Sequence, residues 1–132
     1  MRLWHYELIP YLPRQQLLGQ HRECTALRGK GWGRKHATVD YVFRHSPNNL
    51  IAYHLAVMAE MEKRGYKPDS IWKDGNYRGK VLGYQENWSN VAEIEKILNN
   101  GIFYEEHNDA YLKECLENLA NKNIQIDFNK NI

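Results

Sequence analysis

Residues 46–65 constrain the fold most, because they carry the signals of a long helix in the expected order. Ser46 is a good N-cap residue, Pro47 suits the first helical position, and Gly65 is a good stop signal. The residues between them form a broad stripe with helical spacing: Leu50, Ile51, His54, Leu55, Val57, Met58 and Met61. The segment therefore predicts a helix that buries one wide face.

Three other segments also carry helix signals. One helix is predicted from Pro13 to the glycines at 29–31, with apolar residues at helical spacing. Another begins at Asn90, a capping residue, and stops before Gly101. The last runs from about Asn108 with the following side chains facing inward: Tyr111, Leu112, Cys115, Leu116 and Leu119.

These signals predict an all-α protein, a compact single domain (1–132) of three to four helices with long loops. Loops are expected at 29–37, 66–88 and 101–106. The segment 38–45 is ambiguous, because its β-branched and aromatic residues suit a strand but no partner strand is obvious. We found no repeat and no low-complexity tract.

The charge is distributed unevenly along the chain. Residues 1–36 carry seven Lys/Arg against two acids, a balance of +5, and residues 37–84 carry a balance of +2. Residues 85–132 have four Lys and nine acids, a balance of −5. A basic first third fits a polyanionic partner, although the same residues also suit an ordinary solvated surface.

Other features bear on location. No stretch of about 18 apolar residues suggests a membrane span. The N-terminus contains Glu7 and no continuous apolar run, which argues against a signal peptide. The two cysteines, Cys24 and Cys115, are expected to be reduced thiols, and we expect a cytoplasmic protein.

No common catalytic or metal-binding motif is present: there is no P-loop, no G-x-S-x-G, no H-E-x-x-H and no C-x-x-C. His21 and Cys24 lie three apart on one predicted helix, but no second ligand pair has zinc-like spacing. We therefore predict no metal site.

The dipeptide Arg22-Glu23 is more informative. A carboxylate beside arginines remains charged, and it can stabilise positive charge that develops on a sugar when a glycosidic bond breaks. The alternative is a surface ion pair on a helix, worth under about 1 kcal/mol.

The order of several short motifs resembles a known family. Residues 12–29, which include Arg22-Glu23, are similar to the first helix of the pyrimidine-dimer DNA glycosylases, the phage endonuclease V family. Residues 34–36 (Arg-Lys-His) resemble a triplet after that helix. Residues 59–66 resemble the end of the second helix, and residues 77–79 resemble a Phe-Arg-Gly element before the third.

This resemblance implies a small all-α DNA repair enzyme of base excision. The family flips a nucleotide out of the duplex, attacks the sugar C1′ with the N-terminal α-amine, and forms a Schiff base. It then cleaves the strand by elimination, as an abasic-site (AP) lyase. The implied partner is double-stranded DNA with a damaged base, such as a UV-induced pyrimidine dimer, or an abasic site. The protein is expected to be a DNA-associated monomer that needs no cofactor.

The resemblance also implies roles for individual residues. Glu23 matches the family's essential carboxylate. Because aminopeptidase trimming generally needs a small second residue and Arg2 is large, Met1 is expected to be retained, and its amine to be the nucleophile. DNA contacts are predicted for Arg2, Gln15, Arg22, Arg28, Arg34, Lys35 and His36.

The chain departs from the family at three places. The first is Arg2, because the family nucleophile is a small residue exposed when the initiator Met is removed. His21 stands where the family has Tyr, and the C-terminus lacks the family's aromatic run. Stacking surfaces are instead available among Trp32, Trp72, Tyr77, Tyr84 and Trp88. The lesion stays open, as do two alternatives: a non-catalytic nucleic-acid-binding module, and an enzyme acting on another nucleotide or small substrate.

Overall fold

The computed structural model describes residues 2–128, which confirm the predicted all-α class. Within this range there is no strand, only an isolated antiparallel bridge between Tyr77 and Tyr84. The elements in chain order are η1 (Tyr6–Tyr11), α1 (Arg14–Arg28), η2 (Asp40–Arg44), α2 (Pro47–Lys63), η3 (Ser70–Lys73), α3 (Gly79–Leu82), α4 (Val91–Asn100) and α5 (Asp109–Asn121).

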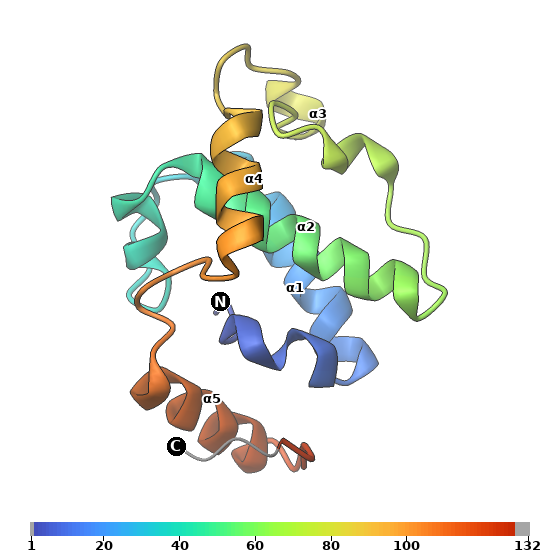
Figure 1. Cartoon of the computed structure of the whole chain (residues 1–132), viewed down its shortest axis with the longest axis vertical. Coiled ribbons are helices and arrows are strands. Elements are labelled where there is room, and N and C mark those ends of the chain that lie inside the picture. Colours follow the sequence, from blue (N-terminus) through green and yellow to red (C-terminus); the bar gives the residue numbers. More distant parts are fainter. Residues whose placement is uncertain (1, 129–132) are drawn as a thin grey trace.

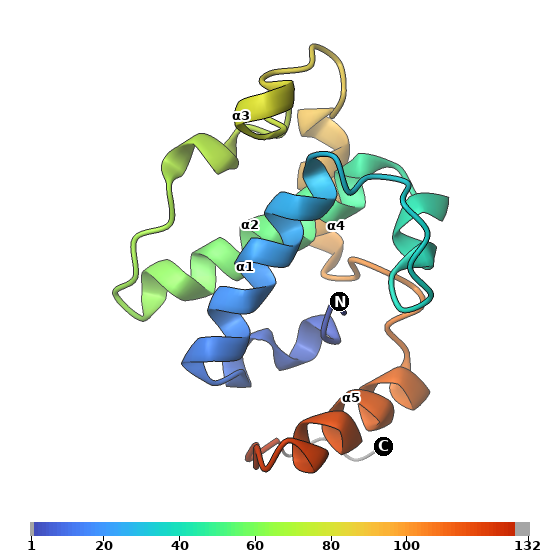
Figure 2. The same ribbon diagram turned by 180° about the vertical axis from the view of Figure 1, so that it is seen from behind.

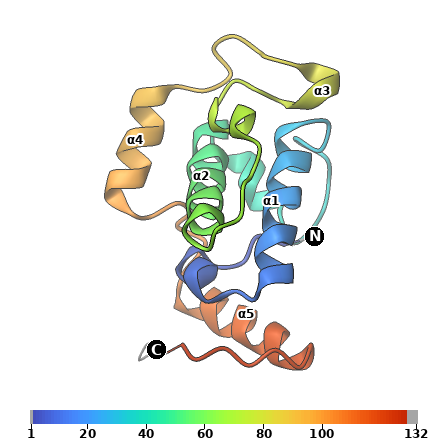
Figure 3. The same cartoon turned by 90° about the vertical axis from the view of Figure 1, so that its right-hand side faces the viewer.

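Helix α2 lies at the centre. Figure 1 shows α1 and α4 crossing it, and Figure 3 shows that they do so on opposite sides, with α5 below. Seen from behind, α1 lies in front of α2, and one long side of α1 is uncovered (Figure 2). The central position of α2 explains why its apolar stripe is so broad, because two helices must cover it. Within residues 2–128, no helix has both the length and the apolar character that a bilayer crossing requires.

The capping signals place the helices as predicted. The side chain of Asn90 accepts a hydrogen bond from the backbone N–H of Glu93, and Asn108 does the same with Tyr111. Gly101 follows α4 in the left-handed conformation that glycine favours. Ser46 occupies the N-cap position of α2, although its side chain makes no capping hydrogen bond.

Two segments differ from the expectation. Residues 40–44 of the ambiguous segment form the 3₁₀ helix η2, which buries Tyr41 and Val42 without any partner strand. The predicted loop at 66–88 contains η3 and the four-residue α3, so α3 is an α-helix beyond the four predicted. Short helices of this length have too few residues for a hydrophobic period to show.

Arg28 was predicted to contact DNA, but its side chain is fully buried. Its guanidinium donates to the backbone carbonyls of Trp72, Asp74 and Tyr77 at 2.6–2.9 Å. Because these donors face inward, Arg28 has no exposed surface for a phosphate in this structure. Its role is instead to tie the segment 72–77 to the end of α1.

A chain of polar side chains continues from Arg28 into α2. Its Nη1 donates to Nδ1 of His54 at 3.0 Å, so the proton of neutral His54 lies on Nε2. That proton is donated to Nδ1 of His21 at 2.8 Å. Burial, followed by the charge of Arg28, holds the pKa of His54 well below its usual range. The histidine on the apolar face of α2 is thus a satisfied core residue.

His107 joins the start of α5 to the N-terminal segment. Its Nδ1 accepts from the backbone N–H of Tyr6 at 3.1 Å, and its Nε2 lies 2.7 Å from the hydroxyl of Tyr41. Because Nδ1 is an acceptor, the folded state holds neutral imidazole with its proton on Nε2. Burial, with a smaller effect of His5, lowers the pKa of His107 to about 3.

Acidification is therefore expected to destabilise the fold below about pH 6.5. The unfolded chain binds a proton at His107 with a pKa of about 6.5, whereas the folded state does not until about pH 3. At pH 5 this difference lowers the free energy of unfolding by about 2 kcal/mol. Urea titrations at pH 7.5 and 5.0 measure the loss. The variant His107→Gln should have a lower free energy of unfolding at pH 7.5, but that free energy should fall less between pH 7.5 and 5.0. An unchanged pH dependence would contradict this assignment.

Candidate active site

A cavity of about 360 Å³ lies beside α1, between the N-terminal segment and α5. We call it the Glu23 pocket, because Glu23 contributes the only carboxylate among the described residues that line it. Those residues are Arg2, Trp4, Gln16, Gly19, Gln20, Glu23, Thr38, Asn118 and Lys122. The positions 16, 19, 20 and 23 share one side of α1, since they recur every three or four residues.

Glu23 has an unusual environment for a helix-borne carboxylate. Its Oε2 atom is buried and has no hydrogen-bond partner within the described part of the chain. No ion pair between Glu23 and Arg22 occurs there either, so the interpretation of this dipeptide as a surface ion pair gains no support. Buried polar atoms without partners are uncommon, and they often mark sites that bind something else.

Gln20 fastens the N-terminal segment to the helix that carries Glu23. Its Oε1 accepts from the backbone N–H of Trp4 at 3.0 Å, and its Nε2 donates to the carbonyl of Arg2 at 2.7 Å. The hydroxyl of Tyr53 adds a bond to Gln20 Oε1 at 2.6 Å. Because Gln20 and Glu23 lie within one turn of α1, the backbone at residue 2 is held close to the carboxylate.

Two cations border the pocket. The guanidinium of Arg2 lies 5.8 Å from the ring of Trp4 and 5.7 Å from that of Tyr111, and it pairs with Glu114 at 3.6 Å. The ammonium of Lys122 lies 5.4 Å from the Trp4 ring. The predicted nucleophile, Met1, lies outside the described residues.

The other predicted DNA contacts lie outside the pocket. Gln15 and Arg22 are exposed on the uncovered side of α1, and Arg34, Lys35 and His36 are exposed in the segment that follows it. His36 is held there by Asp40 and Thr38. The structure thus brings Arg2 and Glu23 together in one pocket, and the five other exposed side chains are not among its lining residues.

Of the nine described residues that line the Glu23 pocket, the sequence identified two, Arg2 and Glu23. Gln20 had a detectable signal, because it is a polar residue on the buried side of α1 with Leu17, Cys24 and Leu27. Asn118 and Lys122 had none, because they reach the pocket only through the docking of α5 against the N-terminal segment.

One cluster of possible metal ligands lies elsewhere, at His45, Glu105 and Glu106. His45 Nε2 is 2.8 Å from a carboxylate oxygen of Glu106, and Arg44 is 3.9 Å from the other. The carboxylate of Glu106 already contacts a histidine and an arginine, so we interpret the cluster as a surface polar network.

Comparison with known protein families gives a match. The family model described as pyrimidine dimer DNA glycosylase matches residues 1–74, which is more than half of the chain. No curated protein and no solved structure gives a significant match. The matched range contains the N-terminal segment, α1 and α2, and therefore most of the Glu23 pocket.

Proposed function

This chain belongs to the pyrimidine dimer DNA glycosylase family, and from that premise we propose that it excises damaged pyrimidines from duplex DNA. The proposed nucleophile is the α-amine of Met1, and the proposed catalytic carboxylate is Glu23. The same amine is proposed to cleave abasic sites as a lyase.

The observation that carries this proposal is the buried Oε2 atom of Glu23, which has no hydrogen-bond partner among residues 2–128. It lies in a pocket bordered by two cations, beside an N-terminal segment that Gln20 holds in place. A structural glutamate would be expected to use both oxygens within the protein or to expose them to water. A carboxylate that binds a substrate needs a buried oxygen that the protein itself leaves without a partner.

The proposed reaction uses only the amine, the carboxylate and water. The amine nitrogen bonds to C1′ as the bond from C1′ to the base breaks, and the base leaves with a proton. Opening of the sugar then gives a Schiff base, with a proton on the former ring oxygen. Loss of a proton from C2′ expels the 3′ phosphate and breaks the strand. We assign Glu23 to stabilise the positive charge on C1′ and the ring oxygen.

The uncovered side of α1 is the proposed DNA surface. Gln15 and Arg22 are exposed and share one side of α1, since they lie seven residues apart, and the basic segment 34–36 follows the helix in the sequence. Side chains of this kind bind phosphates without reading sequence, which suits a repair enzyme that must act at any position. Arg2 is proposed to meet the DNA inside the pocket.

The test uses three duplexes that contain a cyclobutane pyrimidine dimer, an abasic site or no damage. We expect strand cleavage of the first two, and a covalent adduct on both after borohydride reduction. Binding without an adduct would overturn the enzymatic proposal and favour a DNA-binding module. Absence of duplex binding would instead favour an enzyme of small substrates.

Replacing Gln20 tests the role of the N-terminal anchor. The variant Gln20→Leu removes the bonds to Arg2 and Trp4, so we expect adduct formation to slow by about 10–100-fold because the amine is less well positioned. Affinity for the duplex should change by less than about twofold, since Gln20 is buried. Single-turnover trapping and a binding titration measure the two effects.

The matched control is Gln16→Leu, one turn earlier in the same pocket. Gln16 makes no hydrogen bond to the N-terminal segment within residues 2–128, so this variant should keep a nearly normal trapping rate. Equal slowing in both variants would show that any change in the pocket impairs the reaction, which would remove the positioning role from Gln20.

A further inference from the structure

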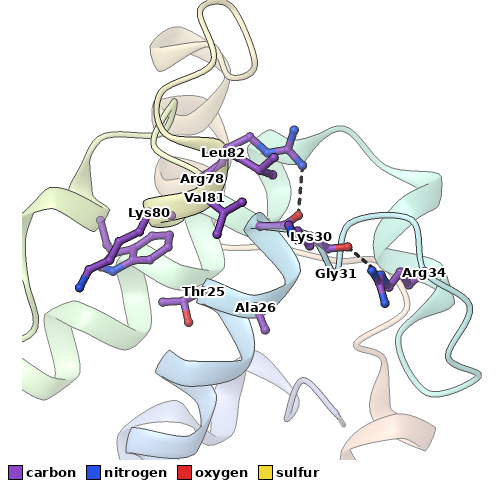
Figure 4. A pocket seen from close by; sticks show the side chains of 12 residues that line it. Thr25, Ala26, Lys30, Gly31, Arg34, Arg78, Lys80, Val81 and Leu82 are labelled. Atoms are coloured by element: carbon purple, nitrogen blue, oxygen red, sulfur yellow. Dashed lines mark hydrogen bonds between the residues drawn. The ribbon is translucent and has the colours of Figure 1, made fainter.

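A second and larger cavity, of about 440 Å³, lies at the C-terminal end of α1. Its other wall is the segment around α3, and Figure 4 shows Val81 and Leu82 between Lys80 on one side and Lys30 and Arg34 on the other. We call it the α3 cavity. No described residue lines both this cavity and the Glu23 pocket. Its volume is in the range of ligand-binding pockets.

The charge of the α3 cavity has a single sign. Lys30, Arg34, Arg78 and Lys80 line it, and none of its described lining residues is acidic. Two of these cations are fixed in place by the backbone. Arg34 Nε donates to the carbonyl of Lys30 at 3.0 Å, and Arg78 Nε donates to that of Arg28 at 2.8 Å. A cavity of this kind favours an anionic ligand.

The remaining wall is apolar and open to solvent. Val81 is 73% exposed and Leu82 is 42% exposed, although a four-residue helix gains nothing in folding by exposing them. The ring of Trp72 adds an aromatic surface on the same cavity. The ligand that suits cations beside exposed apolar groups carries a negative group next to a flat apolar one. A nucleotide, with its phosphate and base, has this composition.

The wall opposite α1 is anchored firmly. Arg28 bonds the carbonyls of Trp72 and Tyr77 to the inside of α1, and its guanidinium lies 5.1 Å from the Trp72 ring. The backbone N–H of Arg78 donates to the carbonyl of Gly83 at 2.8 Å and closes the α3 turn. The cavity is therefore preformed, which lowers the entropy that a ligand must overcome to bind.

The position of the cavity relates it to Glu23. Ala26, on the cavity rim, follows Glu23 by three residues, which is about 4.5 Å along α1. A DNA strand advances about 3.4 Å per nucleotide along its axis. A strand that places its reacting nucleotide at Glu23 and runs along α1 therefore reaches the cavity within one or two nucleotides.

We propose that the α3 cavity is a second nucleotide-binding site, which takes an unstacked nucleotide flanking the reacting one on the same strand. Its phosphate lies among Lys30, Arg34, Arg78 and Lys80, and its base packs on Trp72, Val81 and Leu82. This inference rests on the proposed function, since it needs DNA on α1. The residues 78–82 lie beyond the range of the family model, so the site includes a part of the chain that the family match does not cover.

The experiment uses 2-aminopurine, a base whose emission responds to stacking. Each duplex carries one 2-aminopurine. It stands directly before or directly after a tetrahydrofuran abasic analogue on the damaged strand, or at the matching position of the other strand. The analogue cannot form a Schiff base, so the signal reports binding alone. We expect an emission change of about twofold or more at one flanking position of the damaged strand. The double variant with Val81→Ser and Leu82→Ser should lose it, whereas Val91→Ser, a matched exposed valine on α4, should keep it.

A second measurement tests the phosphate contact. The variant Lys80→Ala should reduce the steepness of the fall of log affinity with log salt by about 1, while Lys96→Ala on α4 should leave it unchanged. Equal emission at all positions, or a signal insensitive to the cavity variants, would overturn this site even if adducts form on natural abasic duplexes. Retention of the position-specific signal without any adduct would overturn the proposed chemistry and support the site.

Discussion

The variant Glu23→Gln is expected to lose base excision and adduct formation by about 10²–10⁴-fold while keeping its affinity for damaged duplex. Glutamine has nearly the shape of glutamate but lacks the charge that stabilises a cationic sugar. Because Glu23 lies within a pocket whose border already carries Arg2 and Lys122, removal of one negative charge should not weaken phosphate binding. Trapping kinetics and a binding titration on the same abasic duplex separate the two properties.

The stability of this variant distinguishes a catalytic role from a structural one. The Oε2 atom of Glu23 is buried without a partner among residues 2–128, and burial of an unpaired carboxylate oxygen costs free energy. We therefore expect Glu23→Gln to unfold at the same urea concentration as the wild type or at a higher one. Glu117→Gln, on the exposed surface of α5, is the control and should leave both activity and stability unchanged. A variant that loses activity together with stability would contradict the catalytic assignment.

The sequence predicted the elements whose signals are local. The caps Asn90 and Asn108 depend on residues within one turn, and the apolar stripe of α2 depends on residues of that helix alone. These helices begin where the sequence places them. The short elements η2 and α3 were not predicted, because four or five residues cannot display a helical period. The backbone just before α3 is held by a side chain from a distant segment, since Arg28 donates to the carbonyl of Tyr77.

In the site, too, local patterns could be predicted from the sequence and contacts between distant segments could not. Glu23 was identified from its neighbour Arg22 and from the family resemblance, both of which are local patterns. Arg28 was assigned to DNA, although its position on the buried side of α1 with Cys24 contains the signal that it points inward. Lys122 enters the pocket from a segment about a hundred residues away, and no spacing in the sequence predicts such a contact.

Extension of the chain by one residue before Met1 is expected to reduce adduct formation by about 100-fold or more. The extended chain still ends in a primary amine, but that amine is displaced by one residue, or about 3.5 Å. The carbonyl of Arg2 is fixed to Gln20, so the backbone cannot slide to restore the original position. A one-residue extension at the C-terminus is the control and should leave the trapping rate unchanged.

An acetylated N-terminus gives the sharper form of this test, because it removes the amine nucleophile altogether. We expect no adduct with this protein on an abasic duplex, while its salt-dependent affinity remains. Lys122 also lines the pocket, and its amine is a second candidate nucleophile. Adducts that persist after acetylation and disappear in Lys122→Arg would transfer the nucleophilic role to Lys122. Loss of adducts on acetylation and their retention in Lys122→Arg would assign that role to the N-terminus.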